Sequence, residues 1–133
     1  MSKGPLLAKT KAFALAAIKL VHAIREHRKE YLLTNQYLRA ATNPGAMARE
    51  AQHAESLPDF IHKLGIAKKE TEEAGYWFEL LEESGLYLTG IECREATALQ
   101  NEVQRLLTAI LRTSRAKLAA QKAAKKKKGD NLN

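Results

Sequence analysis

Apolar and small residues recur alternately four and three positions apart through the first thirty or so residues of the chain. The series is Leu6, Thr10, Phe13, Ala17, Leu20, Ile24, His27 and Tyr31. This spacing places one side chain per turn along one side of an α-helix and forms a heptad seam. Gly4-Pro5 suits the start of such a helix, because a proline at the first helical position gives up an N–H that has no partner there. The pattern therefore predicts a first helix from Pro5 to Tyr31.

A second helix is predicted over residues 34–55, after a short connection at Leu33-Thr34-Asn35. Its narrow seam consists mostly of small side chains, which permit close approach of a neighbouring helix: Leu38, Ala41, Gly45, Ala48 and Ala51 or Gln52. Asn43-Pro44-Gly45 interrupts the seam, and a proline inside a helix costs about 3 kcal/mol unless the helix bends. We therefore expect a kinked second helix, with the alternative that it begins only at Asn43.

Two further helices follow, each after a capping signal. In Ser56-Leu57-Pro58-Asp59, the serine caps the third helix and the aspartate reaches back, and Thr89-Gly90-Ile91-Glu92 repeats this logic for the fourth. Ser84-Gly85 ends the third helix, because glycine adopts the left-handed conformation that closes helices. Their periodic positions are Phe60, Ile61, Leu64, Ala67, Thr71, Ala74, Phe78 and Leu81 in the third, and Ala96, Leu99, Val103, Leu106, Leu107, Ile110 and Leu111 in the fourth.

Four helices joined by short loops bury their apolar faces as an antiparallel up-down-up-down four-helix bundle. Aromatic residues make up only 6% of the chain, which disfavours an all-β fold. We therefore predict an all-α protein in which residues 1–114 form one bundle with a kinked second helix. Beyond Ser114 the seam thins to Leu118, so residues 115–133 are expected to form a basic helical extension or tail.

The single cysteine, Cys93, excludes an internal disulfide and a CxxC redox pair, so we expect a reducing compartment and a cytoplasmic location. It falls in the first turn of the fourth helix with no base to activate it, and a structural thiol is the expectation.

Ala12 to Ile18 is the longest uncharged stretch near the amino terminus, far short of the ~18–20 apolar residues of a membrane span. Neither a signal peptide nor a span is predicted.

Charge is distributed unevenly along the chain. Residues 1–49 carry a net +7, residues 50–102 a net −8 and residues 103–133 a net +8. The run Lys125 to Lys128 has no aromatic neighbour, so it can neutralise phosphates but cannot read bases by stacking. A solubilising helix end is an equally good interpretation of this run, because lysine near a helix carboxyl terminus complements the macrodipole. Attachment to an anionic membrane surface is a weaker option, because only Leu118 and Leu132 offer sizeable apolar anchors.

Catalytic and metal-binding patterns are weak. Glu50-x-x-His53 and Asp59-x-x-His62 have the carboxylate–histidine spacing of di-metal bundles, but both pairs flank one turn at the end of the bundle, so no metal site is predicted. The sequence holds no Gly-rich phosphate loop, nucleophile elbow or HExxH motif, and we expect neither an enzyme nor a cofactor.

Tyr76-Trp77-Phe78 cannot all face one core, so at least one ring must point outward, which favours an interface with another subunit over a wide buried face.

Several motifs resemble those of a known family. They are Gln36-x-Leu38-Arg39-x-Ala41-Thr42, Gly45-Ala46-x-x-Arg49-Glu50-Ala51, Ala54-x-Ser56-x-x-Asp59-Phe60-x-x-Lys63, Ala67-x-Lys69-Glu70-x-x-Glu73 and Tyr76-Trp77-x-x-Leu80-Leu81. In this order and spacing they resemble the four-helix-bundle proteins encoded within intervening sequences of bacterial 23S ribosomal RNA genes. That family is similar, in turn, to the accessory variability protein of diversity-generating retroelements, a basic barrel-shaped homopentamer that binds nucleic acid and a reverse transcriptase.

The resemblance implies a homopentamer of four-helix protomers. It places Arg39, Arg49, Glu50, Asp59, Lys63, Glu70 and Trp77 on motif positions. We expect the charged members, Arg49, Glu50, Asp59 and Lys63 above all, to pair within or between protomers. The chain departs from the family where Met47 replaces the usual asparagine and Asn43-Pro44 replaces a small apolar pair, which puts a polar role at position 47 and the bend of the second helix in doubt.

The sequence therefore favours a non-enzymatic homo-oligomer that binds RNA or DNA non-specifically through phosphates. Because the first and fourth helices adjoin in such a bundle, their cations are expected to share one wall: Lys9, Lys11, Lys19, Arg25, Arg28, Lys29, Arg112, Arg115, Lys117, Lys122, Lys125, Lys126, Lys127 and Lys128. The alternative is a protein–protein adaptor, for example a platform for a polymerase, whose tail is merely solubilising.

Overall fold

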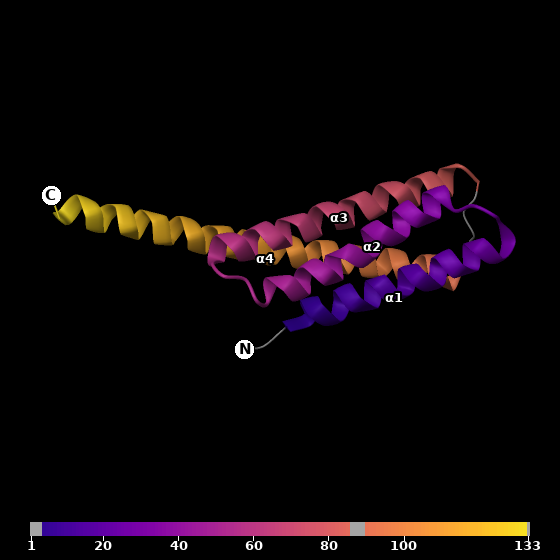
Figure 1. Ribbon diagram of the computed structural model, residues 1–133, viewed down its shortest axis with the longest axis horizontal. Coiled ribbons are helices and arrows are strands. Elements are labelled where there is room, and N and C mark those ends of the chain that lie inside the picture. Colours follow the sequence, from indigo (N-terminus) through magenta and orange to yellow (C-terminus); the bar gives the residue numbers. More distant parts are fainter. Residues whose placement is uncertain (1–3, 86–89, 133) are drawn as a thin grey trace.

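The computed structural model describes residues 4–85 and 90–132, and these form four α-helices. They are α1 (Gly4–His27), α2 (Leu32–Ala51), α3 (Leu57–Glu83) and α4 (Ile91–Leu132). In the described part of the chain each helix packs against two others in a ring, α1 and α3 each against α2 and α4, and no backbone contact crosses the diagonals. Figure 1 shows successive helices running in opposite directions. The predicted all-α up-down-up-down four-helix bundle is confirmed.

The first connection lies earlier than predicted. α1 ends at His27 rather than at Tyr31, and α2 begins at Leu32, so the stretch expected to connect them belongs to α2. The carboxylate of Glu30 accepts hydrogen bonds from the backbone N–H groups of Leu33 (2.6 Å) and Thr34 (3.0 Å). A carboxylate two residues before the start of α2 thus satisfies two N–H groups of its first turn, without a side-chain hydrogen bond from the cap residue Tyr31.

α2 runs without interruption through Pro44, which is buried, so the alternative start at Asn43 is wrong. The bend at Pro44 stays a prediction. The helix ends at Ala51 rather than at Glu55, and a turn leads to α3. There the predicted cap is confirmed: Asp59 N donates to Ser56 Oγ (3.1 Å), and Asp59 Oδ2 accepts from Glu55 N (3.1 Å). The predicted cap at Thr89 lies outside the described residues.

The core follows the predicted seams over most of their length. Every position of the α1 seam from Leu6 to Ile24 is buried, but His27 and Tyr31 are exposed, because the helix ends before they can face the core. Tyr37 of α2 is fully buried and was not predicted from the narrow seam of small residues. Its ring lies against Phe78 of α3, with 6.1 Å between centroids.

Small residues bring α1 and α2 together. A β-carbon built on Gly45 would lie 3.7 Å from backbone and side-chain atoms of Thr10, which is ordinary van der Waals contact. Thr10 itself is buried, and its hydroxyl donates to the carbonyl of Leu6 (2.8 Å). The close approach of these helices therefore depends on the small size of residue 45.

α4 is much longer than the bundle it belongs to. Ser114 is the last buried residue in its described length, and the stretch 115–132, called the extension below, continues the helix for about 27 Å. In Figure 1 the extension leaves the bundle at the end where α1 begins and α2 turns into α3. We call this the extension end and the opposite one, where α1 turns into α2, the far end.

Candidate nucleic-acid interface

The extension presents cations to solvent on all sides. From 115 to 131 every described side chain is exposed except Leu118, which is half-buried. Its residues are mostly alanine and lysine, which are strong helix formers and hold the helix without tertiary contacts. The predicted extension residues Arg115, Lys117, Lys122 and Lys125 to Lys128 are all exposed on it. This arrangement suits a polyanionic partner.

The apolar seam of α4 does not continue along the extension. Ser114 and Leu118 hold seam positions, but the next two are Gln121 and Lys125. A helix whose seam turns polar has no apolar stripe to insert into a coiled coil. Beyond Leu118 the described part of the extension therefore offers a charged rather than an apolar surface.

One side of α4 carries a continuous row of cations, which we call the cationic track. Its members are seven, three, seven and four residues apart and so fall within about 100° of the helix circumference over about 30 Å: Arg105, Arg112, Arg115, Lys122 and Lys126. Arg112 and Arg115 line a hollow together with Lys68 of α3, which places the track on the α3 side of α4. Arg105 was not among the predicted cations, although its seven-residue spacing from Arg112 was visible in the sequence.

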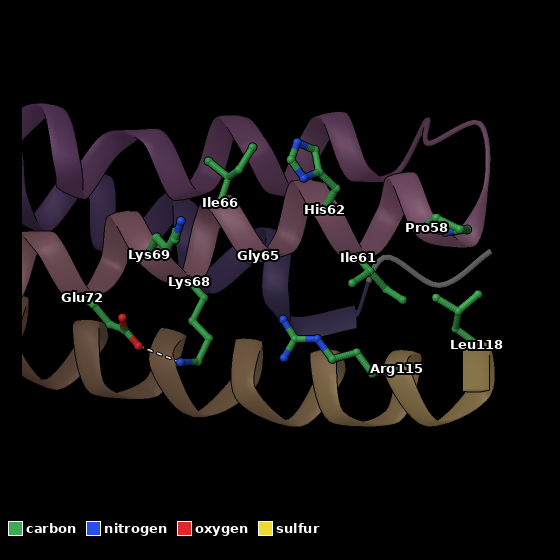
Figure 2. A pocket seen from close by; sticks show the side chains of 10 residues that line it. All are labelled: Pro58, Ile61, His62, Gly65, Ile66, Lys68, Lys69, Glu72, Arg115 and Leu118. Carbon is green, nitrogen blue, oxygen red and sulfur yellow. Dashed lines mark hydrogen bonds and ion pairs between the residues drawn. The ribbon is translucent and has the colours of Figure 1, made fainter. Parts of the chain in front are cut away.

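A groove between α3 and α4 lies beside the track at the extension end. Its lining side chains are drawn in Figure 2. The volume of the groove is about 530 Å³. Lys68 Nζ is bonded to Glu72 Oε1 at 2.6 Å, and Gln104 Nε2 donates to the same oxygen at 3.0 Å. Its lining residues are Pro58, Ile61, His62, Gly65, Ile66, Lys68, Lys69, Glu72, Arg115 and Leu118. Of these residues, only Arg115 was predicted from the sequence to bind nucleic acid.

The cations of α1 are arranged differently from the expected shared wall. α1 and α4 do adjoin, but Lys9 Nζ is paired with Glu102 Oε2 of α4 at 2.8 Å. This hydrogen bond from Lys9 holds the pKa of the Glu102 carboxyl below its ordinary value. The α1 side of α4 thus carries a carboxylate between the cations of α1 and those of α4. The prediction that these cations share one wall is corrected: they lie on separate surfaces.

Three more of the predicted cations belong to the far end. Arg25 is engaged within the protein: Nη2 donates to Thr34 Oγ1 (3.0 Å) and Asn35 Oδ1 (2.6 Å), and its guanidinium lies 5.1 Å from the centroid of the Tyr31 ring. Arg28 and Lys29 are exposed in the α1–α2 connection, the end of the molecule farthest from the extension (Figure 1). Lys11 and Lys19 are exposed on α1 itself.

The charged motif residues mostly join α2 to α3. Lys63 Nζ lies 3.4 Å from Glu50 Oε1 and 3.9 Å from Asp59 Oδ1. These three therefore pair within one protomer, as one of the two predicted arrangements required. Two of them, Glu50 and Asp59, were the carboxylates of the rejected metal pattern, and within residues 4–85 and 90–132 no three potential ligands gather to hold a metal ion.

Glu70 is the second charged link between these helices. Burial raises the pKa of its carboxyl, and the neighbouring Glu73 adds to the rise. Arg39 and a hydrogen bond from Asn43, both on α2, oppose the rise. By contrast, Arg49 is exposed and lines a surface hollow of about 900 Å³ with Lys11, Glu50 and His53.

The aromatic triplet divides as its spacing predicted. Tyr76 is 53% exposed, whereas Trp77 and Phe78 are partly buried against the core. The rings of Tyr76 and Trp77 lie 5.3 Å apart with an interplanar angle of 59°. At least one ring does point outward, and the subunit interface inferred from it stays a prediction.

Buried Cys93 lies in the first turn of α4, as expected. Among the helices of the described chain none combines the length and hydropathy needed to cross a membrane.

Comparison with known proteins identifies relatives of the bundle. The model of the 23S rRNA-intervening sequence protein family matches residues 5–109. A crystal structure of a protein of unknown function from the S23 ribosomal protein family of Bacteroides thetaiotaomicron is 36% identical, with a TM-score of 0.74 over 80% of this chain and 97% of that one. No curated protein matches. Since the family match covers all four helices up to Ala109, this chain belongs to the 23S rRNA-intervening sequence protein family.

Proposed function

We propose that the chain is a non-enzymatic cytoplasmic protein that binds RNA or DNA through phosphates, with the cationic track and the extension as its binding surface. The observation that carries the proposal is the row from Arg105 to Lys126, which passes from the bundle onto an exposed helix that nothing else in the described chain covers. Neither base-reading motifs nor a sheet of stacking aromatics accompanies the row. Binding is therefore independent of sequence, and a target would be chosen by its shape or by a partner.

Counterion release sets the size of the effect. Each phosphate neutralised on double-stranded DNA contributes about −0.9 to the slope of log affinity against log salt. Five track cations engaged together would give a slope of about −4.5. The three remaining lysines of the run, Lys125, Lys127 and Lys128, would make the slope steeper still.

A fluorescence anisotropy titration tests this function. Labelled 20-nucleotide RNA and DNA are titrated with the full chain and with a chain lacking residues 115–133, each at several salt concentrations. The full chain binds at low salt with a steep salt dependence, and the shortened bundle binds at least about tenfold more weakly. Absence of binding at low salt, or equal binding by the shortened chain, contradicts the proposal.

The protein is also proposed to act as a homo-oligomer, with five subunits as the family likeness implies. Support comes from apolar side chains on the outer surface: Leu15 is 51% and Ile18 47% exposed on α1, and Tyr76 is 53% exposed on α3. Exposed apolar groups of this size favour protein contacts. Light scattering measures the subunit number, and a monomer would contradict the proposed oligomer.

An adaptor for another protein, for example a platform for a reverse transcriptase, is the second candidate. The same exposed apolar residues favour it. Capture of such an enzyme by the chain lacking residues 115–133, with nucleic-acid binding lost, would assign the bundle to the adaptor role and the extension to phosphate contact.

A further inference from the structure

The groove between α3 and α4 is chemically two-sided. Its end nearest the α2–α3 turn is apolar, formed by Pro58 and Ile61 of α3 with Leu118 of α4 opposite, and Figure 2 shows Leu118 pointing toward Ile61. Its other side is cationic, with Arg115 reaching from α4 toward Gly65 and with Lys69 on α3. A ligand that has both a flat apolar part and a negative charge fits such a lining.

The groove is open above Gly65, a glycine inside α3. A β-carbon built there would find no atom within 4 Å, so the space above Gly65 is empty rather than filled by a neighbour. The volume of about 530 Å³ lies within the range of small-molecule sites, about 300–1,000 Å³. Glycine inside a helix costs stability relative to alanine, and here no tight contact in the described part of the chain requires it.

The charges of the groove are favourable to a phosphate. Among the described residues that line it, Glu72 is the only carboxylate, and that group is bonded to Lys68 and Gln104. Lys69 and Arg115 make no ion pair within residues 4–85 and 90–132, so both are available. Arg115 also belongs to the cationic track, so a strand bound along the track passes the mouth of the groove.

We propose that this groove seats one unstacked base of a single-stranded segment, between Ile61 and Leu118, while Arg115 and Lys69 hold the adjoining phosphates. The inference rests on the proposed nucleic-acid function and adds to it the class of nucleic acid. Splayed-out bases of single strands bind against apolar side chains and guanidinium planes, whereas paired bases in a duplex are not accessible in this way. The groove lies partly on the extension, beyond the residues that match the family.

The relative affinity for single-stranded and duplex nucleic acid distinguishes a seated base from purely electrostatic binding. A duplex has a higher charge density than a single strand, so a purely electrostatic surface binds the duplex more tightly. A base seated in the groove reverses that order. We expect the full chain to bind a labelled 20-nucleotide poly-dT at least about threefold more tightly than a duplex of equal length at the same salt.

Two variants test the groove with matched controls. Gly65→Leu fills the open space, with Gly129→Leu, an exposed position of the extension, as its control. Leu118→Gln removes the apolar wall, with Ala120→Gln, on another side of the same helix, as its control. Both groove variants should lower poly-dT affinity about tenfold and leave duplex affinity unchanged within about twofold, while the controls change neither. Circular dichroism verifies that all four remain helical.

The outcomes distinguish this inference from the function on which it rests. Salt-sensitive binding with duplex preferred, or groove variants that weaken single strand and duplex equally, overturns the base site and leaves phosphate binding in place. If the full chain binds neither nucleic acid at low salt, both proposals fail. Single-strand preference abolished by Gly65→Leu but not by Gly129→Leu supports the groove.

Discussion

Lys9 of α1 and Glu102 of α4 face each other at 2.8 Å between Nζ and Oε2 and form an ion pair between the first and last helices. Glu95 lies seven residues before Glu102, on the same side of α4. α4 therefore presents carboxylates toward α1 and the cationic track toward α3. This division, rather than a wall shared by α1 and α4, determines which cations remain available.

The Lys9–Glu102 pair predicts a measurable titration. The pKa of Glu102 is lowered in the folded protein, so the pair favours folding above the ordinary glutamate pKa, and its contribution is lost as the pH falls through the lowered value. Lys9→Met should raise the pKa of Glu102, observed through its carboxyl resonance by NMR. Lys11→Met, which removes an exposed lysine two residues away, is the control. An unchanged Glu102 titration in Lys9→Met would mean that the pair does not persist in solution.

Tyr37→Phe should stabilise the protein. Tyr37 is fully buried and its hydroxyl has no hydrogen-bond partner in the described part of the chain, which leaves a desolvated polar group in the core at a cost of about 1–3 kcal/mol. Phenylalanine keeps the ring contact with Phe78 and removes that group. Urea denaturation should show an increase of about 1 kcal/mol in unfolding free energy, and a decrease would reveal a partner for the hydroxyl, such as a buried water molecule.

The same residue makes an alkaline prediction. Burial raises the pKa of Tyr37, so the unfolded chain loses this proton near pH 10 while the folded protein keeps it. Wild-type stability therefore falls as the pH rises above about 10. Tyr37→Phe should be less sensitive in that range, and parallel thermal unfolding curves from pH 8 to pH 11 compare the two. Identical pH dependence of stability in the wild type and in Tyr37→Phe would contradict the attribution of this loss to Tyr37.

Gly45 should tolerate one more carbon but not four. A β-carbon at this position would lie 3.7 Å from Thr10, so Gly45→Ala fits and gains helix propensity, about 0.5–1 kcal/mol. Gly45→Leu would force α1 and α2 apart and should cost about 1–3 kcal/mol. Thermal unfolding of both variants is the measurement. Destabilisation by alanine would show that the helices lie closer than the structure places them.

Ser56→Ala should loosen the start of α3. Ser56 Oγ accepts from Asp59 N, and loss of such a cap costs about 1 kcal/mol. Thr113→Ala, at an exposed position inside α4, serves as the comparison. Amide hydrogen exchange should increase in the first turn of α3 for the former only. Unchanged protection at Asp59 would mean that another group replaces the serine.

Equal numbers of cations removed from two surfaces should give different salt slopes. One variant replaces four track cations with glutamine: Arg112→Gln, Arg115→Gln, Lys122→Gln and Lys126→Gln. A second variant replaces four cations of α1 and the α1–α2 connection: Lys11→Gln, Lys19→Gln, Arg28→Gln and Lys29→Gln. On duplex DNA the first set should reduce the slope by about 3–4 and the second by less than about 1. Equal reductions would place the nucleic acid on both surfaces.

Local sequence determined the helices. Ser56 and Pro58 set the start of α3 at the predicted residue, and the heptad seam from Leu6 to Ile24 is buried as its period required. These features are local because capping and periodicity act within a few turns. The predicted end of the first helix at Tyr31 was wrong, and the seam positions His27 and Tyr31 are exposed. They lie next to Glu30, which accepts a hydrogen bond from the first turn of α2, and helix propensity alone does not reveal this interaction.

Tertiary structure decided which charges stay available. Lys9 and Arg25 look like available cations in the sequence, but each finds a partner on a neighbouring helix, whereas Lys63 pairs with Glu50 of α2 in one of the predicted arrangements. Lys69 and Gly65 gain significance only when α3 lies beside α4 and leaves a groove between them, whereas the place of Arg105 in the cationic track follows from its spacing along α4. The period of a helix follows from its own residues, whereas the environment of a surface charge depends on atoms distant in the sequence, and only the packed bundle brings these together.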